Sequence, residues 1–261
     1  MKKPILDIIF ASEKRKNMLL LLQDGPKEME TILRTLETTR QALLPQIRIM
    51  EEHHLIVHYD DAYKLTMPGK LIVNKMIPLV NTCRSLNKNI DFFASHNIDP
   101  IPSHIFERIN EIRNCEIIEP SLVDIFEMNK DFVEEAYNSS SLSFLLAFSH
   151  PAFSEVIARL AEGDKNTSII VNEEIFDKFK SEWYEEFKHY LACENVKFYL
   201  YRKDLELTCL SICERSFVLR LLSKNNKFSN KHLYCKDTGG HQWSKDFFDY
   251  YLKDAELITE I

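Results

Sequence analysis

Two pairs of residues have a spacing that could serve a metal site. His54 and His58 form an HxxxH pair, and Cys209 and Cys213 have the same separation. Zinc ligands four residues apart need one helical face, but the histidine pair falls where a helical pattern gives way to a strand pattern. In a strand-like run, Cys209 and Cys213 are too far apart for one tetrahedral site. We therefore expect a solvated helix end and two core thiols, with no metal.

Motifs of enzyme catalysis are missing from the sequence. Its five glycines form neither GxGxxG, GxxxxGK[ST] nor GxSxG. Phospholipase D chemistry uses a His-x-Lys pair, but none of the nine histidines is followed two positions later by lysine. We therefore expect no enzyme and no cofactor.

The cysteines and the apolar runs bear on the compartment. Six cysteines are scattered through the chain without a CxxC pair, which favours buried, reduced thiols: Cys83, Cys115, Cys193, Cys209, Cys213 and Cys235. The longest apolar runs are too short to cross a bilayer. The N-terminus has no signal-peptide pattern. These features predict a cytoplasmic protein without a membrane segment.

Charge is distributed unevenly along the 261 residues. Residues 1–84 carry 13 Lys and Arg against 10 Asp and Glu, whereas the remainder carries 20 against 30. The whole chain has a formal net charge of −7. A polyanion is therefore expected to meet the N-terminal part.

The first 67 residues have the element order of a winged helix-turn-helix. Residues 4–24 have a helical pattern in two pieces, with Ser12 as a cap for the second. A helix with one apolar face follows in "KEMETILRTLE", then a turn at "TT" and another helix. "LIVHY" and "YKLT" predict a hairpin. We expect a DNA-binding domain over residues 1–67.

The stretch "TTRQALLPQIRIMEEHHLI" is a helical pattern with a proline in its middle. With Thr39 as N-cap, Leu43, Ile47 and Met50 face the core, and Pro45 lies on the exposed face. The proline would then bend the exposed reading end of the helix. Alternatively, the helix begins near Leu43, with Pro45 in its permissive first turn.

The exposed side of this helix is the predicted DNA-reading surface. Its candidate DNA-contact residues, together with two from the hairpin, are Thr38, Thr39, Arg40, Gln41, Leu44, Pro45, Arg48, His58 and Lys64. Asp60 and Asp61 at the hairpin tip would be repelled by phosphate, so we do not expect the tip to enter the minor groove.

Residues 68–108 predict a connecting helix followed by a linker. The apolar positions of the helix repeat at steps of three and four, which is typical of packing onto its own domain or of a dimer seam. "NIDPIPSH" (97–104) has two prolines in a short span and is the strongest linker signal.

Residues 109–261 alternate strand-like and helical patterns, which predicts an α/β domain with a largely parallel sheet and hairpins at its end. The expected strands are 115–119, 141–148, 167–171, 196–202, 206–213 and 216–223. The helical stretches are 121–137, 151–162, 172–192 and 242–258.

Two residues of this domain are candidates for an effector site. His150 directly follows a strand, where open α/β sheets bind ligands. Trp243 could line a pocket, although an aromatic stripe at helical spacing is more often core.

Several fragments together resemble a known family. At the front these are "SEKRKNMLLLLQDGPKEMETI" and "LLPQIRIMEEHHLI…YKLTMPGKLI", and at the back "IPSHIFERINEIRNCEIIEP", "FSHPAFSEVIARLAE", "VNEEIFDKF" and "QWSKDFFDYYL". In this order they resemble the archaeal winged-helix regulators of the methanogenesis and filament-formation regulator family. The resemblance covers nearly the whole chain, and the proline after "LL" belongs to the family pattern. It implies an ArsR-like winged helix and a regulatory α/β domain, acting as a dimer on promoter DNA.

The sequence therefore predicts a multidomain α+β and α/β protein that regulates transcription. Its expected partners are double-stranded promoter DNA, a second copy of the chain, and an unidentified small-molecule or protein effector. One alternative is a winged-helix module for protein–protein contact without DNA binding, which the acidic hairpin tip and the negative net charge favour. Another is an α/β enzyme with an accessory helical domain.

Overall fold

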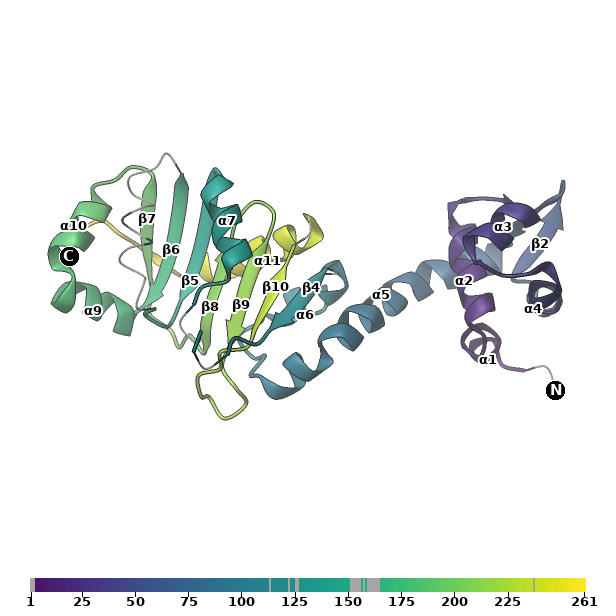
Figure 1. The fold of residues 1–261 in the computed structure, drawn as a ribbon, viewed down its shortest axis with the longest axis horizontal. Coiled ribbons are helices and arrows are strands. Elements are labelled where there is room, and N and C mark those ends of the chain that lie inside the picture. Colours follow the sequence, from purple (N-terminus) through teal and green to yellow (C-terminus); the bar gives the residue numbers. More distant parts are fainter. Residues whose placement is uncertain are drawn as a thin grey trace. The chain divides into compact units, whose positions relative to one another are not determined.

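The computed structural model describes residues 3–112, 114–121, 123–124, 127–150, 156, 158, 165–236 and 238–261. The chain divides into two compact units, Met1–Asn81 and Thr82–Ile261 (Figure 1). The boundary falls inside the long helix α5 (Met67–Ser95), so the segment expected to be a connector, 68–108, is shared between the two units.

The first unit combines helices with one small antiparallel sheet. Its helices are α1 (Ile5–Phe10), α2 (Glu13–Leu21), α3 (Met29–Thr35), α4 (Arg40–Glu52) and the first part of α5, with a 3₁₀ turn at Leu22–Asp24. Its strands are β1 (Lys27–Glu28), β2 (Ile56–Tyr59) and β3 (Ala62–Leu65), in the order β1-β3-β2. Ser12 caps α2 by accepting a hydrogen bond from the backbone N–H of Arg15, as the sequence predicted.

The helices of the first unit enclose one apolar core. Met18, Ile32, Leu43 and Met50 are almost completely buried in it, and Val73 of α5 joins them. Burying each such side chain stabilises the fold by roughly 1.5–3 kcal/mol. The apolar stripes read from the sequence therefore fix which face of each helix is left for solvent.

The hairpin β2–β3 is closed by two aspartates. Asp60 and Asp61 have φ values of 47° and 59°, and the flanking Tyr59 and Ala62 are register partners. Positive φ at both central residues is the geometry of a type I′ turn, which matches the twist of a hairpin. The prediction of a hairpin at this point is confirmed.

The second unit is built on an eight-stranded mixed sheet with the order β11-β7-β6-β5-β8-β9-β10-β4. The strands are β4 (Cys115–Ile118), β5 (Ser141–Leu146), β6 (Asn166–Asn172), β7 (Val196–Tyr201), β8 (Leu207–Ile212), β9 (Phe217–Leu221), β10 (His232–Cys235) and β11 (Glu256–Ile258). The helices are the rest of α5, α6 (Ser103–Phe106), α7 (Lys130–Asn138), α9 (Glu173–Glu182), α10 (Tyr184–Leu191) and α11 (Thr238–Leu252), with a 3₁₀ turn at Ile109–Glu111.

The expectation of a largely parallel sheet is wrong. Only the pairs β5–β6 and β6–β7 are parallel, and every other pair is antiparallel. A parallel return needs a crossover of a dozen or more residues, but only the short segment 202–206 joins β7 to β8. Strand β8 therefore starts at the end of the sheet at which β5, β6 and β7 finish, and it runs antiparallel to its neighbour β5. The hairpin expected among the last predicted strands is confirmed as β8–β9, whereas β10, which pairs with β9, was not among the predicted strands.

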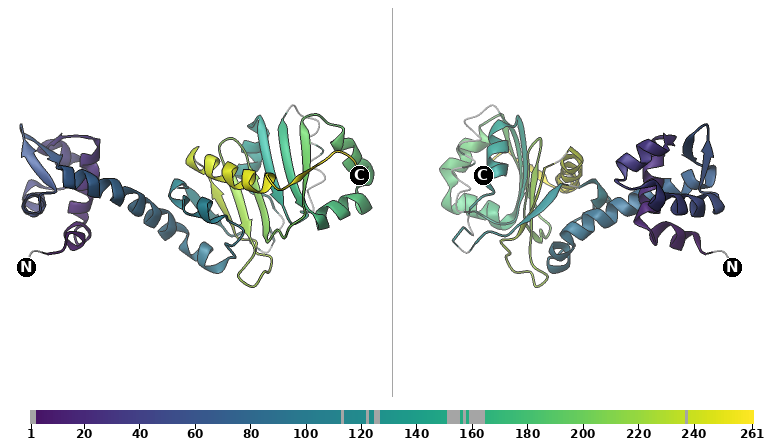
Figure 2. Two further views of the ribbon diagram at one scale, coloured as in Figure 1. Left: turned by 180° about the vertical axis from the view of Figure 1, so that it is seen from behind. Right: turned by 45° about the vertical axis from the view of Figure 1, so that its right-hand side comes forward.

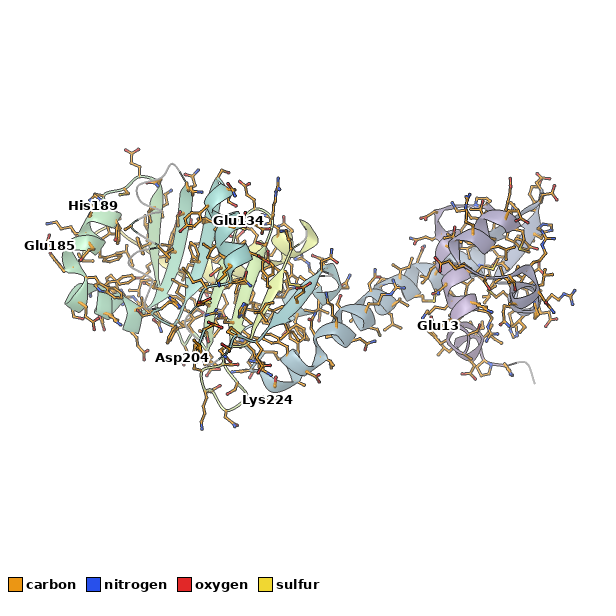
Figure 3. The ribbon with its side chains drawn as sticks, viewed as in Figure 1. Glu13, Glu134, Glu185, His189, Asp204 and Lys224 are labelled. Atoms are coloured by element: carbon orange, nitrogen blue, oxygen red, sulfur yellow. A yellow bond between two sulfur atoms is a disulfide. The ribbon has the colours of Figure 1, made fainter. Side chains whose placement is uncertain are left out.

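Helices cover both faces of the large sheet. Figure 2 shows α11 across one face, and α7, α9 and α10 lie on the other face. Alternate residues of the strands belong to two separate apolar clusters, one for each face. Exposed polar side chains such as Glu134 of α7 and Glu185 of α10 lie on the outer sides of these helices (Figure 3). The helix expected over 151–162 lies outside the described residues.

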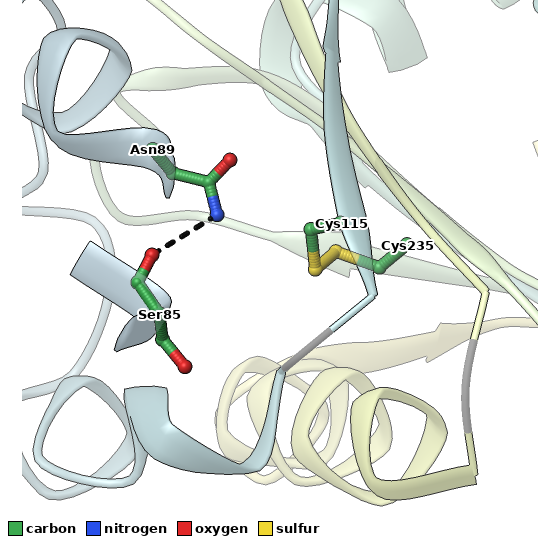
Figure 4. The surroundings of a disulfide bond; sticks show 4 residues. All are labelled: Ser85, Asn89, Cys115 and Cys235. Atoms are coloured by element: carbon green, nitrogen blue, oxygen red, sulfur yellow. Dashed lines mark hydrogen bonds between the residues drawn. A yellow bond between two sulfur atoms is a disulfide. The ribbon is translucent and has the colours of Figure 1, made fainter. Parts of the chain in front are cut away.

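A disulfide joins Cys115 of β4 to Cys235 of β10 (Figure 4). The two residues are directly opposite in the antiparallel register, with their Cα atoms 4.0 Å apart. The expectation that all six cysteines are reduced is therefore wrong for this pair. The disulfide forms because the register of β4 against β10 places the two cysteines opposite each other. They are 120 residues apart in the sequence, so the spacing of the cysteines does not reveal the pair.

The predicted linker at 97–104 packs against the second unit. The backbone N–H of Asn97 donates to the carbonyl of Leu222 over 2.8 Å, and the hydroxyl of Tyr251 donates to the carbonyl of Pro100 over 2.8 Å. Ile101 is 4% exposed. This segment is therefore held by the α/β unit. Across the described part of the chain, no helix combines the length and apolar character needed to cross a membrane.

Candidate nucleic-acid interface

Helix α4 begins at Arg40 and contains Pro45 in its interior. Thr39 is its N-cap, and Thr39 Oγ1 accepts a hydrogen bond from the backbone N–H of Ala42 over 3.3 Å. The N-cap predicted at Thr39 is thus confirmed, and a helix that begins near Leu43 is wrong; that the proline bends the reading end of the helix stays a prediction. Because proline has no N–H, the carbonyl of Gln41 loses its helical partner.

The two faces of α4 separate as its periodicity predicts. Leu43, Ile47 and Met50 are buried in the core. The residues exposed along the opposite side are Gln41, Pro45, Arg48 and Glu52. Pro45 therefore lies on the solvent side of the helix, where its missing N–H weakens no contact with the core.

The exposed face of α4 presents two hydrogen-bond donors about two turns apart. Gln41 and Arg48 project to the same side, because seven residues are close to two helical turns. A glutamine amide can read adenine, and an arginine guanidinium can read guanine through two parallel hydrogen bonds. This face has the chemistry to read base edges.

A buried arginine holds α4 in place. Arg15 of α2 is 8% exposed, and its Nη1 donates to Oε1 of Gln46 over 2.6 Å. Its Nε donates to the carbonyl of Ile8. The side chain thus connects α1, α2 and α4. This contact was not predicted from the sequence. An arginine within a helix that otherwise packs in a core is a signal for a buried hydrogen-bonded contact of this kind.

The start of α4 is more constrained than its middle. Arg40 forms an ion pair with Glu30 over 3.5 Å, with both side chains more than half exposed, so the pair is weak and can be exchanged for another anion. Thr38 and Leu44 are half-buried. The backbone N–H of Thr38 donates to the carbonyl of Leu33 over 3.1 Å, which fixes the turn between α3 and α4.

The two candidate residues of the hairpin interact with its own aromatic rings. The ring centroids of His58 and Tyr63 are 4.6 Å apart. Lys64 Nζ lies 4.1 Å from the centroid of the Tyr59 ring. Tyr63 is buried, and burial raises the pKa of its hydroxyl. The charge of Lys64 therefore lies over the ring of the residue that directly precedes the acidic tip.

His54 and His58 are separated by the end of α4. His54 has a φ of 57°, and its N–H bonds to the carbonyl of Glu51 while Leu55 bonds to Met50, which together form a Schellman end. His58 lies in β2. The pair straddles the break from helix to strand, as predicted. Among the described residues, no group of three His, Cys, Asp or Glu could hold a metal ion.

The two effector candidates lie in different places. His150 lines a cavity beside α7, together with Arg220 and Asn129. Trp243 is fully buried in the cluster on the opposite sheet face, and its Nε1 donates to the carbonyl of Ile105 over 2.7 Å. The structure therefore does not bring the two together, and Trp243 is a core residue.

Comparison with known proteins identifies the family. Two models of one family match the chain: the N-terminal domain of the methanogenesis regulatory protein FilR1 over residues 5–83, and its middle domain over residues 125–254. The methanogenesis regulatory protein FilR1 of Methanothrix harundinacea (strain 6Ac) is 24% identical over 262 residues. That alignment covers 97% of this chain and 58% of the relative.

Similarities to solved structures are remote. An archaeal chromatin protein, TrmBL2, has a TM-score of 0.42 at 12% identity, over 92% of this chain and 91% of that one. A phospholipase D family member, Nuc from Salmonella typhimurium, has a TM-score of 0.39 at 7% identity, over 56% of this chain and 99% of that one. At these scores they establish nothing about this chain.

The matching family consists of regulatory proteins and not of enzymes, in agreement with the missing catalytic motifs. The chain belongs to the family of the methanogenesis regulatory protein FilR1, which confirms the resemblance found in its sequence.

Proposed function

We propose that this chain is a dimeric, sequence-specific DNA-binding regulator of transcription, in which α4 reads promoter DNA and the second unit senses a signal. The observation that carries the proposal is the exposed face of α4, where Gln41 and Arg48 project together from a helix anchored on its opposite side. The family membership and the basic first third of the chain support it.

The order of elements supports a winged helix-turn-helix. Helix α3, a short turn and helix α4 are followed directly by the hairpin β2–β3. In this arrangement the second helix enters the major groove, and its N-terminal residues contact bases and phosphates. Arg48 and Gln41 would contact bases, Arg40 a base or a phosphate, and Thr38 and Thr39 phosphates, with Leu44 and Pro45 against the groove wall.

The hairpin would lie beside the DNA backbone. Asp60 and Asp61 carry two negative charges at its tip, and these repel phosphate. His58 and Lys64 lie farther back on the strands and could each reach one phosphate. The wing would then contribute affinity without reading sequence.

Helix α5 supplies the proposed dimer contact. Leu71 is 65% exposed and Leu79 is 54% exposed, whereas Val73, Met76 and Val80 of the same helix are buried in the core of the first unit. Their spacing of eight residues sets them about 80° apart around the helix. Large exposed aliphatic side chains on one face are typical of an interface, and paired winged helices read two half-sites.

A second candidate function is protein–protein contact without DNA. The acidic hairpin tip and the net charge of −7 favour it. The two functions differ in salt dependence, because DNA binding releases counterions in proportion to the number of phosphate contacts.

Fluorescence anisotropy with a labelled duplex from the upstream region of the chain's own gene tests the proposal. We expect preference for this duplex over a scrambled one of equal composition, and a steep loss of affinity between about 50 and 200 mM salt. Equal affinity for both duplexes, or none, would favour the protein-contact function.

A further inference from the structure

A cavity of about 130 Å³ lies between α7 and the strands β5, β8 and β9. Its walls are largely apolar, with Phe132, Phe144, Leu146, Phe148 and Val218 among the lining residues. An engineered cavity of about 150 Å³ takes up benzene. The space therefore suits a hydrocarbon body of about six carbon atoms.

An arginine in the wall of this cavity has no charged partner among the described residues. Arg220 is 6% exposed and stands in β9 between Leu219 and Leu221, whose buried side chains belong to the apolar cluster on the opposite sheet face. Its Nη2 donates to the carbonyl of Glu127 over 3.4 Å, while its Nε is buried and makes no hydrogen bond. Within the described ranges no carboxylate forms an ion pair with Arg220. Buried charges are ordinarily paired.

The described residues around Arg220 supply no compensating negative charge. The carboxylate of Glu127 is half exposed and pairs with Lys130 Nζ over 3.1 Å. His232 belongs to the neighbouring strand on the same sheet face, and burial and the charge of Arg220 lower its pKa to about 4, so it is neutral. Thr208, 2% exposed, adds a buried hydroxyl without a partner. The wall thus offers unused donors and an unbalanced positive charge.

We propose that this cavity binds a small amphipathic monocarboxylate, with its carboxylate on the guanidinium of Arg220 and its hydrocarbon part among the aromatic and aliphatic walls. This inference rests on the proposal that the second unit senses a signal, and it names the chemical class of the effector.

The chemistry of the wall selects a carboxylate over other ligands. A single guanidinium matches a carboxylate through two parallel hydrogen bonds. A phosphate dianion would need more donors than Arg220 and Thr208 supply, and an amine would be repelled. A neutral hydrocarbon would leave the arginine unpaired.

The ligand would also join two elements. Arg220 belongs to the sheet, whereas Phe132 and Asn129 belong to the start of α7. A carboxylate on Arg220 with its hydrocarbon part against Phe132 would tie α7 to β9. Binding is therefore expected to stabilise the folded second unit.

Isothermal titration of the full chain with octanoate, benzoate and octanol tests the inference. We expect both carboxylates to bind and to raise the Tm, and octanol to bind at least tenfold more weakly than octanoate. Arg220→Met should raise the Kd for octanoate at least tenfold and leave the Kd for octanol unchanged. The matched control is Arg215→Met, which removes an exposed arginine from the turn between β8 and β9.

Three results would overturn the inference: no binding of either carboxylate to the wild-type chain, equal binding of octanoate and octanol, or full octanoate affinity in a folded Arg220→Met variant. If that variant does not fold, the difference between the Kd values of octanoate and octanol for the wild-type chain tests the inference by itself. Octanoate binding that leaves DNA affinity unchanged would support the site and contradict the sensing role.

Discussion

Asn129 at the start of α7 donates a hydrogen bond from Nδ2 to Nε2 of His232 in β10, over 3.3 Å. The amide orientation is fixed, because its Oδ1 accepts from the backbone N–H of Phe132. Nδ1 of His232 faces the carbonyl of Asn230, so Nδ1 carries the ring proton and Nε2 accepts. A neutral histidine thus joins α7 to the sheet.

Acid should weaken this junction. The pKa of His232 falls from 6.5 to about 4 because of burial and the charge of Arg220. Between these values the unfolded chain binds more protons, so the stability contributed by neutral His232 is complete above about pH 6.5 and is lost as pH falls toward 4.

His232→Gln should lose this dependence, which amounts to about 3 kcal/mol across the window. Urea unfolding at pH 7 and pH 5 measures the part of this effect that falls between those two values, about 2 kcal/mol. A variant whose free energy of unfolding falls with acid as steeply as that of the wild type would contradict the assignment.

The disulfide should stabilise the second unit. It joins residues 120 apart, and the loop-entropy model gives roughly 4–5 kcal/mol for a loop of this size. Reduction, or Cys115→Ser, should lower the free energy of unfolding by an amount of this order. Cys83→Ser, which removes an exposed free thiol, is the control and should change little. Six titratable thiols in the unfolded, unreduced chain would show that the bond is absent.

Trp243 should prove structural. In Trp243→Phe the buried carbonyl of Ile105 loses the indole donor and keeps only the backbone N–H of Arg108, at a cost of about 0.5–1.5 kcal/mol. Octanoate titration of the variant should match that of the wild type, since Trp243 lies on the sheet face opposite the cavity. If the variant has wild-type stability and no longer binds octanoate, Trp243 is part of the effector site and the structural assignment is wrong.

Sequence patterns predicted local features better than long-range ones. The faces of α4 follow from the spacing of Leu43, Ile47 and Met50, and the hairpin follows from two β-like runs around Asp60 and Asp61. Each of these depends on a few neighbouring residues. Strand β1 was not predicted, because a strand of two residues has no pattern of its own.

The features that the sequence did not predict depend on which strands become neighbours in the sheet. The antiparallel entry of β8 follows from a short connection, and the disulfide follows from the register of β4 against β10. Two residues of the cavity wall leave a trace in the sequence: His150, which follows a strand and was a predicted effector residue, and the arginine inside "SFVLRLLS". A charge in the middle of a buried strand is a signal for the proposed site, and Arg220 was not among the predicted residues.

The dimer contact should depend on α5. Leu71→Glu combined with Leu79→Glu places two charges on the exposed aliphatic face and should convert a dimer into a monomer in light scattering. Asn87→Glu, which adds a charge at an exposed polar position of the same helix, should leave the dimer intact. A double variant that remains dimeric would exclude this face as the contact.

Arg48 gives the most direct test of the account. Binding of the upstream duplex should be measured by anisotropy for the wild type, Arg48→Ala and the control Arg215→Ala, in the same salt series. We expect Arg48→Ala to lose roughly 1–3 kcal/mol for the upstream duplex while retaining its weak binding to the scrambled one. Arg215→Ala should match the wild type. An Arg48→Ala variant with unchanged affinity and unchanged preference would contradict α4 as the reading helix.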